Sequence, residues 1–188
     1  AGAGLASVLL GALPAVAQDL EAMRPIAAFS TVFLEEMTWM EVRDAIREGT
    51  TTAIVATGGV EQNGPYVASG KHNFVLQATT EAIALELGNA LVAPIVKFVP
   101  EGNIDPPSGH MCFHATISVS QATFVALLTD VVSSLAVHGF TDIVLIGDSG
   151  GNRRGMQAVA QALNGHRVAH QVDALVLLEL RNQVLDQQ

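Results

Sequence analysis

Two short runs of apolar, mostly β-branched residues restrict the fold of this chain more than any other feature. They are Thr-Thr-Ala-Ile-Val-Ala-Thr at 51–57 and Thr-Asp-Ile-Val-Leu-Ile at 141–146. Continuous runs of this kind are typical of strands that are buried on both faces of a parallel sheet. Residues 90–99 are a third strand candidate, and residues 174–180 are a fourth, whose register the sequence leaves open.

Segments with apolar residues at helical spacing separate these runs. Residues 38–41 (Thr-Trp-Met-Glu) match a capping box and open a helix that ends near Gly49. Further helices are predicted over 73–87, over 120–138 and from 153 to about 163. Alternating strands and helices predict an α/β fold, a three-layer α/β/α sandwich with a mostly parallel sheet and helices on both faces.

The composition limits the partners that this chain can bind. Of its 188 residues, 49% are apolar and 14% are charged, which suits one globular domain with a sizeable core. The net charge is −9 and there is no basic cluster, which argues against nucleic acid and anionic membrane surfaces as partners. Cys112 is the only cysteine, so an internal disulfide and a cysteine-based zinc site are excluded.

Residues 1–18 differ from the rest of the chain. They carry no charge, contain an apolar run at 8–10 and end in Ala-Val-Ala at 15–17. This pattern is typical of the apolar region and cleavage site of a secretory signal peptide; an apolar N-terminal helix of the domain is the alternative. The run is too short to span a bilayer. We expect a partial signal peptide at 1–18, a domain at 19–188 and a secreted or periplasmic location.

Three polar, glycine-rich segments, 58–72, 100–114 and 147–152, follow the carboxyl ends of predicted strands. In a parallel sheet these ends share one edge, where ligands bind. The segments should therefore converge and bring together carboxylate and imidazole groups, namely those of Glu61, His72, His110, His114 and Asp148. Such groups suit Zn²⁺, Mn²⁺ or Fe²⁺, although loop residues of these types are often merely solvated.

Ser149 offers a different chemistry. It lies between a predicted strand and a predicted helix, where a serine can act as a nucleophile with the helix N-terminus stabilising an oxyanion. His110 or His114 would then have to act as the base. In the structural alternative, Gly150 and Gly151 allow a tight turn while Ser149 or Asp148 caps the helix.

Three motifs, in order, resemble the creatininase (creatinine amidohydrolase) family. Residues 51–88 are similar to its strand followed by Gly-x-x-Glu-Gln-His-Gly-Pro-His and then Gly-Thr-Asp. Residues 109–120 resemble its His-x-x-Phe-Pro-Gly-Thr-Ile-Ser segment, and residues 138–152 resemble its His-Gly-Phe and Asn-Gly-His-Gly-Gly-Asn segments. The resemblance runs from about residue 38 to about residue 163. It implies a hydrolase of non-peptide C–N bonds, such as those of small or cyclic amides.

The resemblance implies an altered metal site. Glu61 retains the family's metal-binding Glu, but Asn63 falls on a metal-binding His, His72 on the Asp of Gly-Thr-Asp, and Ser149 on the His of Gly-His-Gly-Gly-Asn. One hypothesis is a rearranged site in which Glu61, His72 and Asp148 hold a divalent ion that activates water. The other is a homologue that has lost its metal.

The resemblance also implies which residues surround the substrate. His110 matches a family His in the substrate loop and is assigned to catalysis, as a proton carrier or substrate contact. The predicted substrate contacts are Asn63, His114, Gly150, Gly151 and Asn152.

The resemblance has implications for the whole protein as well. Family members continue beyond the position that Gln188 occupies and commonly form oligomers, so we expect a C-terminally truncated domain and a homo-oligomer. The alternative functions are a serine hydrolase that uses Ser149 and a catalytically inactive secreted binding protein.

Overall fold

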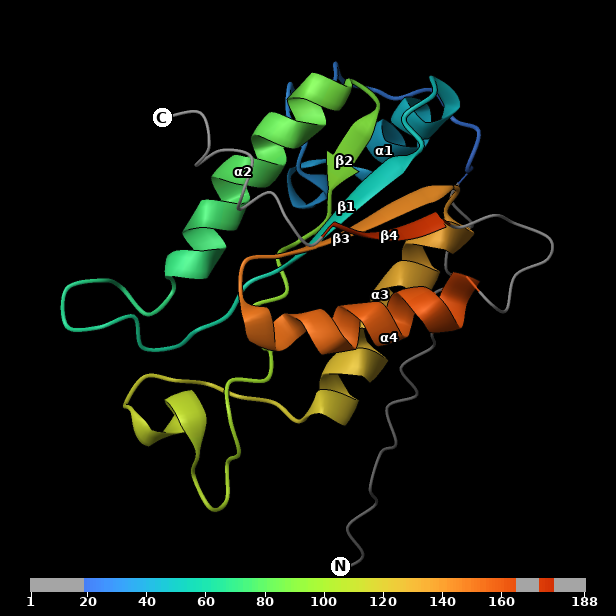
Figure 1. Cartoon of the computed structure of the whole chain (residues 1–188). Coiled ribbons are helices and arrows are strands. Elements are labelled where there is room, and N and C mark those ends of the chain that lie inside the picture. The colour runs from blue at the N-terminus through green and yellow to red at the C-terminus, as the bar shows by residue number, and fades with distance from the viewer. Residues whose placement is uncertain (1–18, 165–172, 178–188) are drawn as a thin grey trace, which may run out of the picture.

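A parallel sheet of four strands forms the middle of the molecule in the computed structural model, which describes residues 19–164 and 173–177. The strands are β1 (Thr52–Thr57), β2 (Ala90–Val92), β3 (Asp142–Gly147) and β4 (Asp173–Leu177), in the spatial order β2-β1-β3-β4 (Figure 1). β1 pairs with β3 along its full length, from Thr52 opposite Asp142 to Thr57 opposite Gly147.

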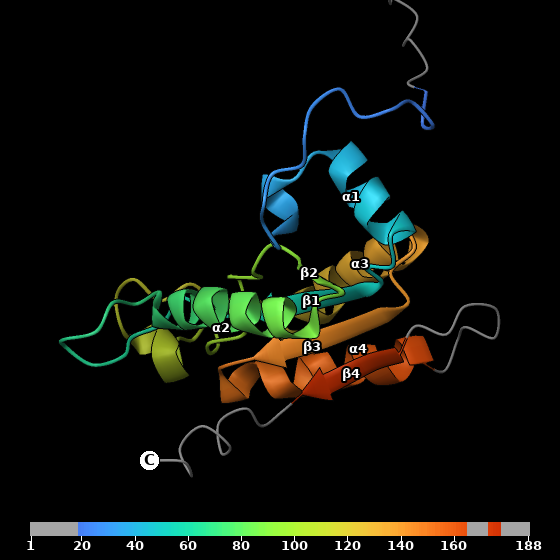
Figure 2. The same cartoon turned by 90° about the horizontal axis from the view of Figure 1, so that it is seen from above.

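Helices cover both faces of this sheet. α2 (Lys71–Leu87) packs on one face, and α1 (Trp39–Arg47), α3 (Gln121–Val137) and α4 (Arg153–Asn164) pack on the other (Figures 1 and 2). Three short 3₁₀ turns complete the described elements: η1 (Leu34–Glu36), η2 (Gly109–Cys112) and η3 (Gly150–Asn152). The predicted three-layer α/β/α sandwich with a parallel sheet is confirmed.

β1 is the centre of the core, because all six of its residues are buried. Successive side chains of a strand point to opposite faces. Ala53 and Val55 therefore pack in the cluster on the α3 and α4 side, while Ile54 and Ala56 pack in the cluster on the α2 side. A strand buried on both faces explains why this run shows no polar alternation.

Two predicted boundaries were wrong. The strand predicted at 90–99 ends at Val92. The Ala93 N–H still donates to the Ile54 carbonyl of β1 at 2.9 Å, but the next N–H that bonds to β1 is three residues further on instead of two, so the regular ladder stops. The chain returns to β1 at Val96, whose N–H donates to the Ala56 carbonyl at 2.8 Å. α2 begins at Lys71 and not at Asn73, so His72 lies in the first turn of the helix and not in the preceding loop.

Some predicted features fall outside the described residues. The predicted signal peptide at 1–18 does, and so do residues 178–180 of the fourth predicted strand. Among the helices that the structure describes, none has the length and apolar character needed to cross a membrane.

The topology predicts a ligand site at the carboxyl ends of the two central strands. From β1 the chain crosses over one face through α2 to β2, and from β2 it crosses over the other face through α3 to β3. β2 and β3 therefore flank β1, and the strand order reverses at β1. The crevice beyond the carboxyl ends of β1 and β3 is the place where open parallel sheets bind ligands.

Gly155 allows α4 to pack closely on α3. A Cβ atom at this position would lie 2.5 and 2.6 Å from two ring carbons of the fully buried Phe124. We expect Gly155→Ala to destabilise the protein by about 1–3 kcal/mol through overpacking, despite the better helix propensity of alanine. Gly150→Ala is the control, since a Cβ there has no atom within 4 Å. Urea unfolding of both variants measures the difference; equal midpoints would contradict the packing argument.

The capping box predicted at 38–41 opens α1. Glu41 Oε2 accepts a hydrogen bond from the Thr38 N–H at 2.7 Å, and Oε1 accepts one from the Phe29 N–H at 2.6 Å. The Glu41 backbone N–H in turn donates to Thr38 Oγ1. The hydrogen bonds from the Thr38 and Phe29 backbone, together with that from the Thr38 hydroxyl, lower the pKa of Glu41 to about 2.

This lowered pKa gives Glu41 a pH-dependent part in stability. A carboxyl group with a depressed pKa stabilises the fold above its unfolded value of 4.5, and this contribution is lost as the pH falls toward 2. We expect Glu41→Gln to be less stable than wild type at pH 7, with a difference that shrinks between pH 4.5 and 2. Denaturant midpoints measured across this range check it, with the exposed Glu81→Gln as control. A pH-independent difference would be the contrary result.

Candidate active site

Four side chains from separate parts of the chain meet beyond the carboxyl ends of β1 and β3. Glu61 lies in the loop after β1, His72 in the first turn of α2, His110 in η2 and Asp148 directly after β3. These residues come from the three segments that were expected to converge, as the parallel strand order requires.

His72 is at the centre of this group. Its Nε2 lies 2.7 Å from Glu61 Oε1, and its Nδ1 lies 2.6 Å from Asp148 Oδ2. Each ring nitrogen thus lies at hydrogen-bond distance from one carboxylate oxygen, so neither nitrogen of the ring is left without a partner. His72 is 5% exposed, which makes this a largely buried chain of charge-assisted hydrogen bonds.

His110 connects the buried Glu61 with the solvent. Its Nε2 lies 3.2 Å from Glu61 Oε2, and its Nδ1 lies 3.4 Å from the side-chain amide of Gln62. The His110 side chain is 41% exposed, whereas the Glu61 side chain is 8% exposed. His110 is therefore placed to contact a bound molecule or to exchange protons between Glu61 and water.

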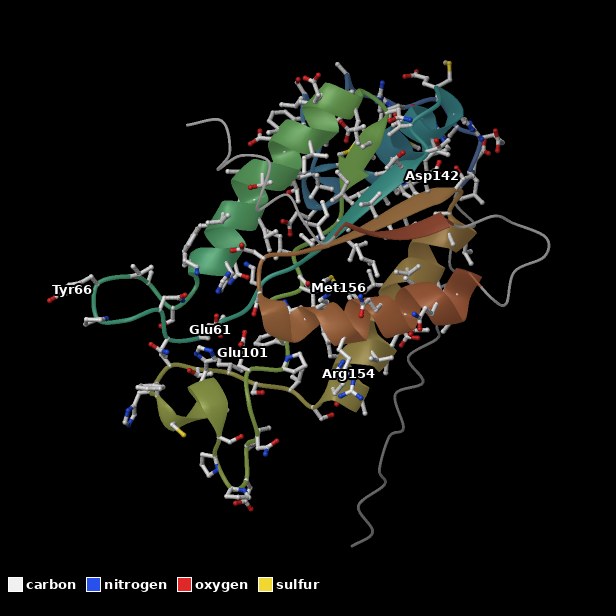
Figure 3. All side chains as sticks on the ribbon, in the orientation of Figure 1. Glu61, Tyr66, Glu101, Asp142, Arg154 and Met156 are labelled. Carbon is white, nitrogen blue, oxygen red and sulfur yellow. The ribbon has the colours of Figure 1, made fainter. Side chains whose placement is uncertain are left out.

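Glu101 is a further member of the site, and the sequence analysis missed it. It follows the strand candidate at 90–99, just as Glu61 and Asp148 follow their strands. The rule that ligands bind beyond the carboxyl ends of parallel strands could therefore have identified it. Its carboxyl group is buried beside that of Glu61, with which it shares a hydrogen bond, and Figure 3 shows the two residues close together. Within the part of the chain that the structure describes, Glu101 Oε1 has no hydrogen-bond partner.

The two glutamates have opposite pKa shifts. Burial, together with the hydrogen bond and negative charge of Glu61, raises the pKa of Glu101 to about 8. Burial opposes the ionisation of Glu61, but hydrogen bonds from Glu101 and His72 and the charge of His110 outweigh it, so the pKa of Glu61 is lowered. At neutral pH the pair therefore holds one proton, which is on Glu101, while Glu61 is ionised.

We call Glu61, His72, Glu101, His110 and Asp148 the acid–imidazole cluster. Two glycines directly after β1 leave space for the side chains of Glu101 and of Asn73. A Cβ atom on Gly59 would lie 2.2 Å from Glu101 Oε1, and one on Gly58 would lie 2.1 Å from Asn73 Oδ1. Asn73 holds this turn, since its side chain accepts from the Gly59 N–H and donates to the Gly59 carbonyl.

Asn152 corrects one of our predictions, because the structure places it in the core and not toward a substrate. Its side-chain NH₂ donates to the Thr57 carbonyl at 3.0 Å and to the Gly58 carbonyl at 2.8 Å, and the residue is fully buried. It thus satisfies two backbone acceptors at the end of β1, where the sheet ladder stops. Asn152 ties η3 to β1 and is not part of the site that we propose.

The other predicted substrate contacts lie around the cluster. Asn63 donates its side-chain NH₂ to the Glu61 carbonyl at 3.0 Å, so it supports the loop that carries Glu61. Gly150, Gly151 and His114 are exposed. Their contact with a substrate stays a prediction.

The serine hypothesis lacks its base in this arrangement. Both proposed bases have other environments, because His110 contacts Glu61 and His114 is exposed. Among the hydrogen bonds of the described residues, none joins Ser149 Oγ to an imidazole. The neighbouring Asp148 bonds to His72 instead.

The residues present do not fit a metal ion as they are arranged. Within residues 19–164 and 173–177, no group of three or more His, Cys, Asp or Glu side chains has the geometry to hold one. The expected ligands Glu61, His72 and Asp148 are together, but both nitrogens of His72 are at hydrogen-bond distance from carboxylates. A metal ligand needs a free lone pair on the nitrogen that binds.

Comparison with known proteins places this site in a family. The family model described as creatinine amidohydrolase matches residues 35–187. The creatinine amidohydrolase of Pseudomonas putida is 27% identical over 116 residues, which are 62% of this chain and 44% of that protein. The 3-dehydro-scyllo-inosose hydrolase of Thermotoga maritima is 24% identical over 120 residues, 63% of this chain and 36% of that protein. The match thus covers less than half of each relative.

Solved structures show the same fold. A manganese form of creatininase superposes with a TM-score of 0.68 at 23% identity, covering 84% of this chain and 63% of that one. A mutant creatininase described as the Zn–Zn type superposes with a TM-score of 0.64 at 24% identity, covering 79% and 58% of the two chains. Since the family model matches most of the sequence, the chain belongs to the creatininase family.

Proposed function

We propose that this protein hydrolyses a C–N bond in a small amide or cyclic amide, with Glu61 as general base and Glu101 as general acid. The observation that carries the proposal is the pair of adjacent glutamates with opposite pKa shifts at the carboxyl edge of the sheet. Two neighbouring acids whose pKa values diverge are the arrangement that separates an acid from a base at one pH. The names of both curated relatives, an amidohydrolase and a hydrolase, support the reaction class.

In the proposed reaction, Glu61 and Glu101 carry out all of the proton transfers. Ionised Glu61 takes a proton from water, and the resulting hydroxide attacks the carbonyl carbon of the amide. Protonated Glu101 gives its proton to the nitrogen as the C–N bond breaks. The products are a carboxylic acid and an amine, and transfer of a proton from Glu61 to Glu101 restores the starting state.

The other cluster members position this pair. His72 holds Glu61 Oε1 and ties it to Asp148, which fixes the direction in which Oε2 points. His110 lies 3.2 Å from that Oε2 and is partly exposed, so it stands where a substrate would enter. Positioning of this kind contributes to rate because the reacting groups are already oriented when the substrate binds.

The expectation of a metal-activated water is not part of this mechanism. Relatives exist in manganese and zinc–zinc forms. In this chain the expected ligands bond to one another, and the described residues do not fit a metal. We therefore derive no step through a metal ion.

Substitution of the two glutamates tests the acid–base assignment. We expect Glu61→Gln and Glu101→Gln each to lower kcat/KM by about 10²–10⁴-fold, because each removes one proton-transfer group. Glu101→Gln should fold normally, since glutamine resembles the protonated acid. The exposed Glu81→Gln serves as the matched control, and Ser149→Ala tests the serine alternative; neither should lose activity. The assay measures amine release from a panel of small amides, cyclic amides and formamides.

The pH dependence gives a second test of the same pair. Glu101 must be protonated to act as the acid, so kcat/KM should fall as the pH rises through about 8. Full activity of both glutamine variants, or a wild-type rate that is constant up to pH 10, would contradict the assignment.

Two sequence expectations are further parts of the proposal. Residues 1–18 support export to the periplasm or medium, and the family resemblance supports a homo-oligomer. Cell fractionation checks the first, and light scattering checks the second.

A further inference from the structure

We propose that the imidazole of His72 fills the position of a metal ion in this site, so that Glu61 and Asp148 are held together without a metal. The proposal rests on the proposed function only for the location of the site. Its test needs no catalysis, so the failure of one does not imply the failure of the other.

The distances around His72 are those of hydrogen bonds and not of a shared metal. The imidazole lies 2.7 Å from Glu61 Oε1 and 2.6 Å from Asp148 Oδ2. Two atoms that bind the same zinc ion at about 2.0–2.2 Å each are separated by roughly 3 Å or more. The carboxylates have therefore closed on the ring, and both of its nitrogens are used.

His72 also gives the two carboxylates a polar partner at the place where a metal would lie. Glu61 is buried and Asp148 partly buried, and buried carboxylates are costly without a cation or hydrogen-bond donors. The ring lies between them, with one nitrogen at hydrogen-bond distance from an oxygen of each. The third carboxyl group, Glu101, is buried and bonded to Glu61, so it adds a proton and not another uncompensated charge.

Two of the three positions that differ from the family pattern make other contacts. Asn63 directs its side-chain NH₂ to the Glu61 carbonyl, and His72 bridges two carboxylates. Ser149 follows Asp148 and is partly buried, and in the described part of the chain its side chain makes no hydrogen bond to the cluster. These two changes therefore form an alternative centre in which the His72 ring lies between two carboxylates, and within residues 19–164 and 173–177 no group of three or more His, Cys, Asp or Glu side chains could hold a metal ion.

Metal analysis of the folded protein tests the proposal directly. The protein, purified without chelators, is analysed by mass spectrometry after incubation with excess Zn²⁺ or Mn²⁺ and desalting. We expect no stoichiometric metal and the same melting temperature with either ion or with EDTA. One or more ions per chain, lost in His72→Ala, would overturn the proposal.

Substitution of the imidazole by a carboxylate gives the complementary result. His72→Asp removes the ring and places another carboxylate beside Glu61, Asp148 and Glu101. We expect this variant to bind Mn²⁺ or Zn²⁺ and to melt at a higher temperature in its presence, unlike wild type. His114→Asp, which changes an exposed histidine, should behave like wild type. A variant that folds but gains no affinity for either ion would count against His72 as the replacement for a metal.

A measurement on the wild type keeps the test decisive if His72→Asp does not fold. In a ¹H–¹⁵N spectrum at neutral pH, the ring signals of His72 should not change when Zn²⁺ is added. Ring signals that shift with one equivalent of Zn²⁺ would refute the proposal.

Discussion

The parallel pairing of β1 with β3 is the constraint on which the rest of the structure depends. The two strands pair over their full length, so their carboxyl ends finish side by side. Glu61 follows one end and Asp148 the other, and both are within reach of one imidazole on α2. Without this register the two carboxylates would not share His72, and the site would have no centre.

Maintaining the site requires backbone groups to be satisfied where the sheet ladder stops. Asn73 and Asn152 perform this task from opposite sides of the turn after β1, by bonding to Thr57, Gly58 and Gly59. A fixed turn keeps the carboxyl group of Glu61 in one orientation. Buried backbone groups without partners are costly, and the two asparagine side chains supply partners for the backbone at this turn.

The function proposed for this chain keeps the site of the family fold and assigns a different chemistry to it. The fold supports substrates at the edge of the sheet, and the acid–imidazole cluster occupies that edge. The two glutamates of the cluster have opposite pKa shifts, so that Glu61 is ionised and Glu101 is protonated at neutral pH. Such a pair can serve hydrolysis with groups of the protein itself, whereas the creatininase structures that resemble this fold include manganese and zinc–zinc forms.

The sequence alone determined the α/β class, the parallel sheet and the edge at which the site lies. These follow from local patterns, namely buried β-branched runs, helical spacing and glycines, and from the rule that parallel strands end at one edge. Only the tertiary structure decided how the side chains pair. His72 and Asp148 are 76 residues apart in sequence, and the burial that protonates Glu101 exists only after folding. Side-chain direction and burial depend on long-range packing, so the sequence did not reveal that His72 bonds to two carboxylates or that Asn152 faces the core.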